Sequence, residues 1–195
     1  MDASLGVTME RQSTVDGLRR RPISRLEYEQ MAEVGILAPD ERIELLRGEI
    51  VAMSPIGSRH AWSVAKVTRL LVEQLGPSHD IRPQSPLTLW DDSEPEPDLA
   101  VVPAGTPDRH PDTCLLVIEV AQTSFRVDAT VKAALYAEAA IPVYWIVDVA
   151  RGLVLVHTEP AAGRYQRIDE RRPGDVLTVP HLPTLAIPVA AIVAT

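Results

Sequence analysis

The segment from residue 114 to residue 148 constrains the fold of this chain most strongly. It reads CLLVIEVAQTSFRVDATVKAALYAEAAIPVYWIVD. Residues 114–120 and 143–148 are apolar runs typical of strands that are buried on both faces, and the alanine-rich residues 126–140 predict a helix between them. A strand, a helix and a strand joined by short connections predict a right-handed βαβ unit with two parallel strands.

One carboxylate interrupts the first of these strands. Glu119 has apolar neighbours on both sides, and Lys132 stands in the middle of the following helix. A charged group inside a buried strand is unfavourable unless it has a partner or a metal ion. We therefore expect other polar residues to gather around Glu119.

The remaining segments predict further helices and strands around this unit. Ser24 and Glu27 form a capping-box pattern that opens a short helix ending at Gly35. Residues 42–53 predict a β-hairpin turning at Arg47-Gly48, and residues 58–75 predict a helix stopped by Gly76-Pro77. Short strands are expected within 80–90, at 98–102, at 153–157 and at 165–168, and the apolar pieces after them are expected to extend the sheet.

These expectations define the fold class and the domain organisation. The elements predict an α/β (α+β) fold with a central mixed sheet, flanking helices and extra β-hairpins. Residues 1–22 are polar without a clear period and are expected to form a flexible arm, and residues 23–195 a single domain.

Composition excludes several classes of protein. The single cysteine, Cys114, rules out a disulfide framework or a cysteine zinc site within one chain, and it is expected to be a small buried apolar residue. The five histidines are too scattered for a histidine metal site. No apolar run resembles a signal peptide or a membrane span, so a cytoplasmic location is expected. The net charge of −8 disfavours non-specific nucleic-acid binding through overall charge.

Three carboxylates fall on predicted strands, namely Glu44, Asp98 and Glu119. Oxygen ligands of this kind suit Mg²⁺ or Mn²⁺, and a rigid sheet can fix them in place. Other interpretations stay open for two of them. Glu44 is also compatible with an outward position on a half-exposed hairpin, and Asp98 with a turn residue after Pro97.

The helix contributes a polar face. Asp128, Lys132 and Tyr136 are spaced i, i+4 and i+8, so they share one face with about 40° of drift per step. If this face looks toward Glu119, Lys132 could reach a water or a phosphate there. The alternative is that Asp128 and Lys132 form an ordinary exposed ion pair. Tyr144 and Trp145 read as core residues.

Several motifs of this chain resemble those of a known family. PDL at 97–99, VIEV at 117–120, DATVKAALYAEA at 128–139 and IPVYWIVD at 141–148 are similar to motifs of the Uma-two family of restriction endonuclease-like proteins. This family belongs to the PD-(D/E)XK nuclease superfamily. ELLRGEIV at 44–51 and MSP at 53–55, followed by His60, match in the same order. The resemblance spans about residues 24–190.

The resemblance implies a restriction-endonuclease-like core and a set of site residues. Asp98, Glu119 and the backbone carbonyl of Val120 would hold the metal, with Glu44 as an accessory acid. The superfamily's usual lysine position, two residues after the second acid, is Ala121 here. The lysine is expected instead on the following helix, at Lys132. The resemblance also singles out family positions of unassigned role, which are His60 and Tyr136; the helix pattern adds Asp128 as an accessory residue.

The leading hypothesis is a Mg²⁺-dependent endonuclease that hydrolyses phosphodiester bonds in DNA. The competing hypothesis is a nuclease-fold binding or assembly module with little or no catalysis, because fold analogy alone does not establish activity. A third is a structural protein whose strand acids pair with arginines. A homodimer or higher homo-oligomer is expected, since exposed sheet edges must be covered.

Overall fold

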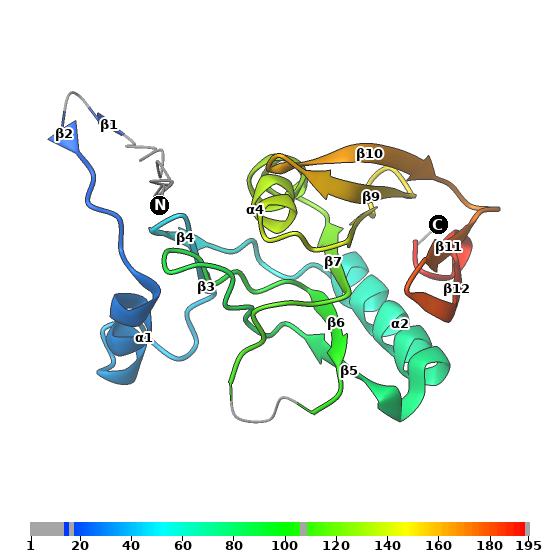
Figure 1. Cartoon of the computed structure of the whole chain (residues 1–195), viewed down its shortest axis with the longest axis horizontal. Coiled ribbons are helices and arrows are strands. Elements are labelled where there is room, and N and C mark those ends of the chain that lie inside the picture. The colour runs from blue at the N-terminus through cyan, green and yellow to red at the C-terminus, as the bar shows by residue number, and fades with distance from the viewer. Residues whose placement is uncertain (1–13, 16–17, 106–108, 194–195) are drawn as a thin grey trace, which may run out of the picture.

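The structure, a computed structural model, describes residues 14–15, 18–105 and 109–193. Its centre is a six-stranded sheet (Figure 1). In spatial order the strands are β10 (Arg164–Arg171), β9 (Leu153–Ala161), β8 (Val143–Asp148), β7 (Leu116–Ala121), β6 (Leu99–Pro103) and β5 (His79–Pro83). The expected flexible arm falls largely on residues outside the described ones, and the division at residue 23 stays a prediction.

The two central strands are parallel, as the βαβ pattern predicted. Val117 lies opposite Tyr144, and Glu119 lies opposite Ile146. All other neighbouring pairs in this sheet are antiparallel. The sheet is therefore mixed, and the predicted α/β class with flanking helices is confirmed.

Side chains of β7 alternate between two hydrophobic cores on opposite faces of the sheet. Leu116, Ile118 and Val120 pack into the core beneath α2, while Val117 and Ala121 pack into the core beneath the second helical segment. Because alternate residues of a strand share a face, Glu119 points toward that second segment. The segment consists of α3 (Phe125–Val127), a π-helical turn η2 (Asp128–Lys132) and α4 (Ala133–Glu138).

The long helix α2 (Ser58–Leu75) has the bounds that the sequence predicted. Its buried residues, Ser63, Val67, Leu71 and Leu75, recur every four positions and form the stripe that covers the sheet. Gly76 ends the helix with a φ of 58°, a left-handed conformation that glycine adopts readily, and the 3₁₀ turn η1 (Gly76–Ser78) leads into β5.

The amino-terminal elements form a separate layer that positions Glu44. Helix α1 (Arg25–Glu33) begins with the predicted capping box, in which Ser24 and Glu27 bond each other reciprocally. The hairpin of β3 (Ile43–Leu46) and β4 (Glu49–Ala52) turns at Arg47-Gly48 as expected. A bridge between Leu45 and Glu94 joins this hairpin to the acidic loop before β6, which brings β3 next to the central sheet.

Two parts of the chain differ from the expectation. The last strands do not extend the central sheet; β11 (Val176–Val179) and β12 (Leu182–Pro188) pair only with each other in the described part of the chain, and η3 (Val189–Ala191) follows them. Their apolar residues instead close the core beneath α2, which explains their apolar sequence. Of the strands expected within 80–90, only β5 forms. The short strands β1 (Thr14–Val15) and β2 (Leu18–Arg19) pair near the amino terminus.

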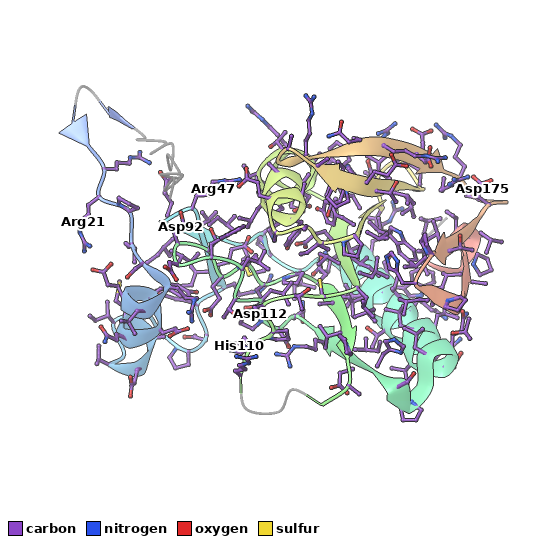
Figure 2. All side chains as sticks on the ribbon, in the orientation of Figure 1. Arg21, Arg47, Asp92, His110, Asp112 and Asp175 are labelled. Carbon is purple, nitrogen blue, oxygen red and sulfur yellow. The ribbon has the colours of Figure 1, made fainter. Side chains whose placement is uncertain are left out.

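Charged side chains lie mainly on the outside. Arg21, His110, Asp112 and Asp175 are exposed (Figure 2). Cys114 is buried, as predicted. In the described part of the chain, none of the helices has both the length and the apolar character that a membrane span needs.

Replacing a buried leucine of α2 tests the packing of this helix on the sheet. Leu71 is fully buried, whereas its neighbour Val72 is 53% exposed. We expect Leu71→Ala to lower the free energy of unfolding by about 2–5 kcal/mol and Val72→Ala to change it by less than about 0.5 kcal/mol. Denaturation by urea measures both values, and equal effects would contradict this packing.

Candidate active site

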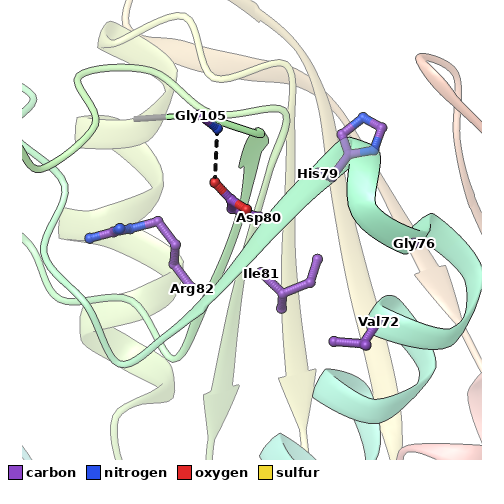
Figure 3. Close-up of a pocket in the computed structure, with 7 residues that line it drawn as sticks. All are labelled: Val72, Gly76, His79, Asp80, Ile81, Arg82 and Gly105. Carbon is purple, nitrogen blue, oxygen red and sulfur yellow. Dashed lines mark hydrogen bonds between the residues drawn. The ribbon is translucent and has the colours of Figure 1, made fainter. Parts of the chain in front are cut away.

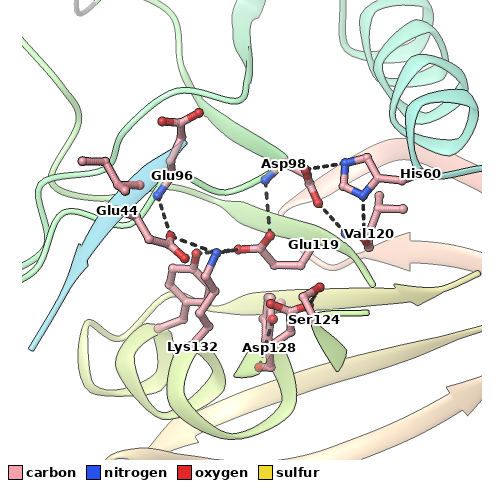
Figure 4. A network of polar contacts seen from close by, with 12 residues as sticks. Glu44, His60, Glu96, Asp98, Glu119, Val120, Ser124, Asp128 and Lys132 are labelled. Atoms are coloured by element: carbon pink, nitrogen blue, oxygen red, sulfur yellow. Dashed lines mark hydrogen bonds and ion pairs between the residues drawn. The ribbon is translucent and has the colours of Figure 1, made fainter. Parts of the chain in front are cut away.

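Glu119 is the centre of a buried polar network (Figure 4). It is only 4% exposed, and its Oε1 atom accepts hydrogen bonds from Lys132 Nζ at 3.0 Å and from the Tyr136 hydroxyl at 2.9 Å. Asp128 and Lys132 are both buried, so the interpretation as an ordinary exposed ion pair is wrong. The polar face of the helix looks toward Glu119, as the spacing suggested.

Asp98 lies beside Glu119 because β6 and β7 are antiparallel neighbours. It sits at a bend directly before β6, and the pairing of Leu99 with Ile118 brings it level with Glu119. Its Oδ2 atom accepts the Val120 N–H at 2.8 Å, and its own N–H donates to Glu119 Oε2 at 3.4 Å. Asp98 is therefore a bend residue whose carboxylate is buried and fixed by the neighbouring strand.

Glu44 joins the network from β3. It is 4% exposed, which excludes the outward position on the hairpin. Its Oε2 atom lies 3.0 Å from Lys132 Nζ and accepts the backbone N–H of Glu96 at 3.1 Å. Lys132 thus bridges two carboxylates that come from different layers of the molecule.

His60 reaches the other end of the network from the first turn of α2. Its Nδ1 atom lies 2.9 Å from the Val120 carbonyl oxygen, which only accepts, so Nδ1 carries a proton. Its Nε2 atom lies 2.9 Å from Asp98 Oδ1, a contact that is an ion pair when the ring is protonated. The contact with Asp98 raises the pKa of His60 above its usual value, although burial opposes the shift.

Burial and neighbouring charges shift the pKa values of these groups. Burial raises the pKa of Glu119 well above its ordinary value, and Lys132 offsets only part of this rise. Burial alone would lower the pKa of Lys132, but the carboxylates of Glu119, Glu44 and Asp128 outweigh it and raise that pKa. The neighbouring carboxylates therefore favour the charged ammonium form of Lys132.

The Asp128 carboxylate bonds to Ser124 and makes no hydrogen bond to the other described acids of the network. It accepts this hydrogen bond from the Ser124 hydroxyl at 2.6 Å. Burial raises its pKa to about 6, against the lowering effect of Lys132. Asp128 adds negative charge near Lys132 without touching Glu119.

The oxygen donors of this network suit a cation of the Mg²⁺ or Mn²⁺ kind. Asp98, Glu119 and the Val120 carbonyl supply hard oxygens, and the hydrogen bonds of Asp98 with Glu119 and Val120 place its carboxylate beside that of Glu119. His60 contacts Asp98 Oδ1 and the Val120 carbonyl through its two different ring nitrogens. Among the described residues, no three His, Cys, Asp or Glu side chains form a group that would hold a metal. Mg²⁺ takes only one or two carboxylates and keeps several waters, so this donor set still fits it.

The structure brings together Glu44, Asp98, Glu119 and Lys132, with Tyr136 and His60 in direct contact. Ala121, the usual lysine position of the superfamily, packs in the core beneath α4 on the same face as Glu119. Sequence reasoning missed Glu96 and Ser124, which contribute a backbone N–H and a hydroxyl. Tyr144 and Trp145 are fully buried core residues, as the sequence indicated.

Two surface cavities lie away from this network. One, of about 620 Å³, lies between the end of α2 and β5 and is lined by Val72, His79, Asp80 and Arg82 among others (Figure 3). The second, of about 400 Å³, lies between α1 and the loops around Trp90 and His110. Neither cavity includes a residue of the network.

Comparisons with known proteins support the fold. The family model Uma2, described as "Putative restriction endonuclease", matches residues 26–190. A crystal structure described as a "putative nuclease belonging to DUF820", from Anabaena variabilis, has a TM-score of 0.70 and 14% sequence identity and covers 88% of this chain and 97% of that chain. At this level of identity the likeness shows the fold alone. No curated protein matches the chain.

Replacing Lys132 by methionine tests whether it compensates the buried acids. Removing one partner of a buried ion pair leaves an uncompensated charge, so we expect Lys132→Met to lower the free energy of unfolding by about 3–5 kcal/mol near neutral pH. Arg69→Met, which removes an exposed pair with Glu73, should lower it by less than about 1 kcal/mol. Urea denaturation without added divalent metal compares the two variants.

The pH dependence of this variant has a defined sign. A carboxyl whose pKa is raised on folding contributes stability below its unfolded pKa, and this contribution is lost as the pH rises through the folded value. Without Lys132 the pKa of Glu119 rises further. The deficit of Lys132→Met relative to wild type should therefore grow as the pH is raised from about 5 toward 8. A deficit that shrinks over this range would show that Lys132 does not neutralise Glu119.

Proposed function

This chain belongs to the Uma2 family, as its sequence motifs indicated, and we propose on this premise that it is a divalent-metal-dependent nuclease that hydrolyses phosphodiester bonds in DNA. The observation that carries the proposal is the convergence of two buried carboxylates, Asp98 directly before β6 and Glu119 on β7, with the buried ammonium group of Lys132. Acids that can hold a metal ion, beside a cationic side chain, suit metal-assisted phosphodiester hydrolysis.

The metal would be held by Asp98, Glu119 and the Val120 carbonyl, with Glu44 assisting. A bound Mg²⁺ or Mn²⁺ would activate a water for attack and offset the negative charge that develops on the phosphate. The family generally uses divalent metal ions, and Mg²⁺ or Mn²⁺ is the ion proposed for this chain. The two acids need no rearrangement of the backbone, because neighbouring strands already fix both carboxylates.

The chain's own residues orient the reactants and balance their charge. Lys132 would align the attacking water or stabilise a phosphate oxygen, since an ammonium group that stays ionised can serve both roles. Tyr136 donates to the same oxygen of Glu119 as Lys132 does and so fixes the rotamer of that carboxylate. His60 contacts Asp98 and the Val120 carbonyl and holds both in register.

A protein with a net charge of −8 needs a local cationic surface to bind DNA. Arg59, Trp62 and Lys66 recur at i, i+3 and i+7 on α2, the helix that carries His60, and so share one helix face. Trp62 is 40% exposed, and Lys66 Nζ lies 5.4 Å from the centre of its ring. Positive charge beside an exposed aromatic ring suits phosphates and unstacked bases.

A nuclease-fold binding or assembly module is the second candidate. The burial of Glu44, Asp98, Glu119 and Lys132 favours it, because a substrate phosphate cannot reach groups that are this well covered without some movement of the chain. A homodimer or larger assembly would suit either function. In the described structure β5 and β10 form the open edges of the central sheet, and such edges favour pairing with another chain.

Isosteric replacement of the two acids tests the proposed function. We expect wild-type protein to cleave plasmid or single-stranded DNA only with Mg²⁺ or Mn²⁺ present. Asp98→Asn and Glu119→Gln should each reduce the cleavage rate by about 100-fold or more, because a neutral amide cannot replace a metal-binding carboxylate. Glu33→Gln, which changes an exposed acid of α1, is the matched control and should cleave like wild type.

Calorimetry with Mn²⁺ provides a second readout that does not depend on cleavage. Wild type and Glu33→Gln should bind the ion, and the two site variants should bind it much more weakly. Wild-type protein that neither binds Mn²⁺ nor cleaves any DNA would overturn the nuclease proposal and favour the binding module.

A further inference from the structure

The helix that carries Lys132 is not a regular α-helix. Between α3 and α4, residues Asp128–Lys132 form a π-helical turn, in which the Ala133 N–H donates to the Asp128 carbonyl five residues earlier. A π-turn contains one residue more than an α-turn, and single π-turns inside α-helices occur frequently at functional sites. The spacing of Asp128, Lys132 and Tyr136 suits a regular helix and gives no sign of this turn.

A tyrosine from the neighbouring strand stabilises the wide turn. The hydroxyl of Tyr144, on β8, donates a hydrogen bond to the Asp128 carbonyl oxygen at 3.1 Å. This oxygen thus accepts from both Tyr144 and Ala133, which uses both of its lone pairs. Tyr144 is fully buried, and its ring contacts that of Tyr136 with the centres 5.0 Å apart. The strand therefore holds the helix at the residue where the π-turn begins.

The wide turn sets how Lys132 and Tyr136 approach Glu119. On a regular α-helix, side chains four residues apart diverge by about 40°. Here Lys132 Nζ and the Tyr136 hydroxyl both reach the same atom, Glu119 Oε1, at 3.0 and 2.9 Å. Lys132 is the last residue of the wide turn and Tyr136 lies on the α-helix that follows, so the turn sets the rotation at which both side chains face Glu119.

We propose that Tyr144 is a positioning residue of this site, whose hydroxyl holds the π-turn open and thereby directs Lys132 at Glu119. Tyr144 touches neither Glu119 nor Asp98 by a hydrogen bond, so it acts through the Asp128 carbonyl and the helix. The structural part of this proposal is independent of enzymatic activity. Its consequence for catalysis rests on the proposed nuclease function.

The test compares two buried tyrosines of one aromatic cluster. Tyr144→Phe removes the hydroxyl from the Asp128 carbonyl. Tyr165→Phe is the matched control, because the Tyr165 hydroxyl donates to the Ile141 carbonyl at 2.9 Å, outside the π-turn, and its ring stacks on Tyr144. Each variant keeps its ring and loses one hydrogen bond to a backbone carbonyl, so both should remain folded.

Two NMR readouts report the geometry of the turn without any substrate. We expect Tyr144→Phe to speed hydrogen exchange of the Ala133 amide about five- to tenfold relative to amides of β7, since one hydrogen bond at the turn is lost. The Lys132 ammonium resonance should also shift and exchange faster. Tyr165→Phe should leave both signals as in wild type. In the cleavage assay, Tyr144→Phe should lower kcat about tenfold with little change in KM.

Each outcome decides the proposal. If Ala133 exchange and the Lys132 resonance are the same in Tyr144→Phe as in wild type, or if Tyr165→Phe changes them equally, Tyr144 does not position Lys132. If the NMR changes appear but wild type neither binds Mn²⁺ nor cleaves any DNA, the positioning role stands and the nuclease proposal fails. If the NMR changes appear and kcat is unaltered in an active nuclease, the catalytic consequence is overturned.

Discussion

The contact of Lys132 with Glu119 and Glu44 is the interaction on which the rest of the site depends. Moving charged groups out of water is unfavourable by several kcal/mol for each ion, and only close, well-bonded partners repay it. Lys132 makes two contacts of 3.0 Å to carboxylates from separate layers. Without this ammonium group, the acids of β3 and β7 could not lie buried side by side as charged groups.

The charges of the site are nevertheless not balanced by Lys132 alone. Three buried acids, Glu44, Asp98 and Glu119, face Lys132 at one end and His60 at the other. Burial also raises the pKa of Glu119 and Asp128, which shows that negative charge here is unfavourable. An added cation would relieve this excess, so the electrostatics of the folded chain agree with a metal site at Asp98 and Glu119.

The sequence predicted the central unit well because its elements have strong local patterns. Two apolar strands around an alanine-rich helix have few alternative arrangements, and Glu119 stood out because its neighbours are apolar. The π-turn was not predictable, since its residues have the spacing of a regular helix and the turn depends on a tertiary hydrogen bond from Tyr144. The placing of β11 and β12 also failed, because an apolar strand can cover a core as easily as it can extend a sheet. The link between Glu94 and the β3–β4 hairpin likewise depends on long-range pairing that an acidic loop does not reveal.

The elements that supply the site differ in how firmly the fold holds them. Glu119 belongs to the centre of the sheet, where hydrogen bonds on both sides protect the strand, so this strand is expected to be among the last parts of the domain to open. Glu44 lies on a two-stranded hairpin, and His60 lies in the first turn of a helix, and such peripheral units open at a much lower free energy. Local opening on the Glu44 and His60 sides would therefore expose the buried acids while the strand that carries Glu119 stays intact.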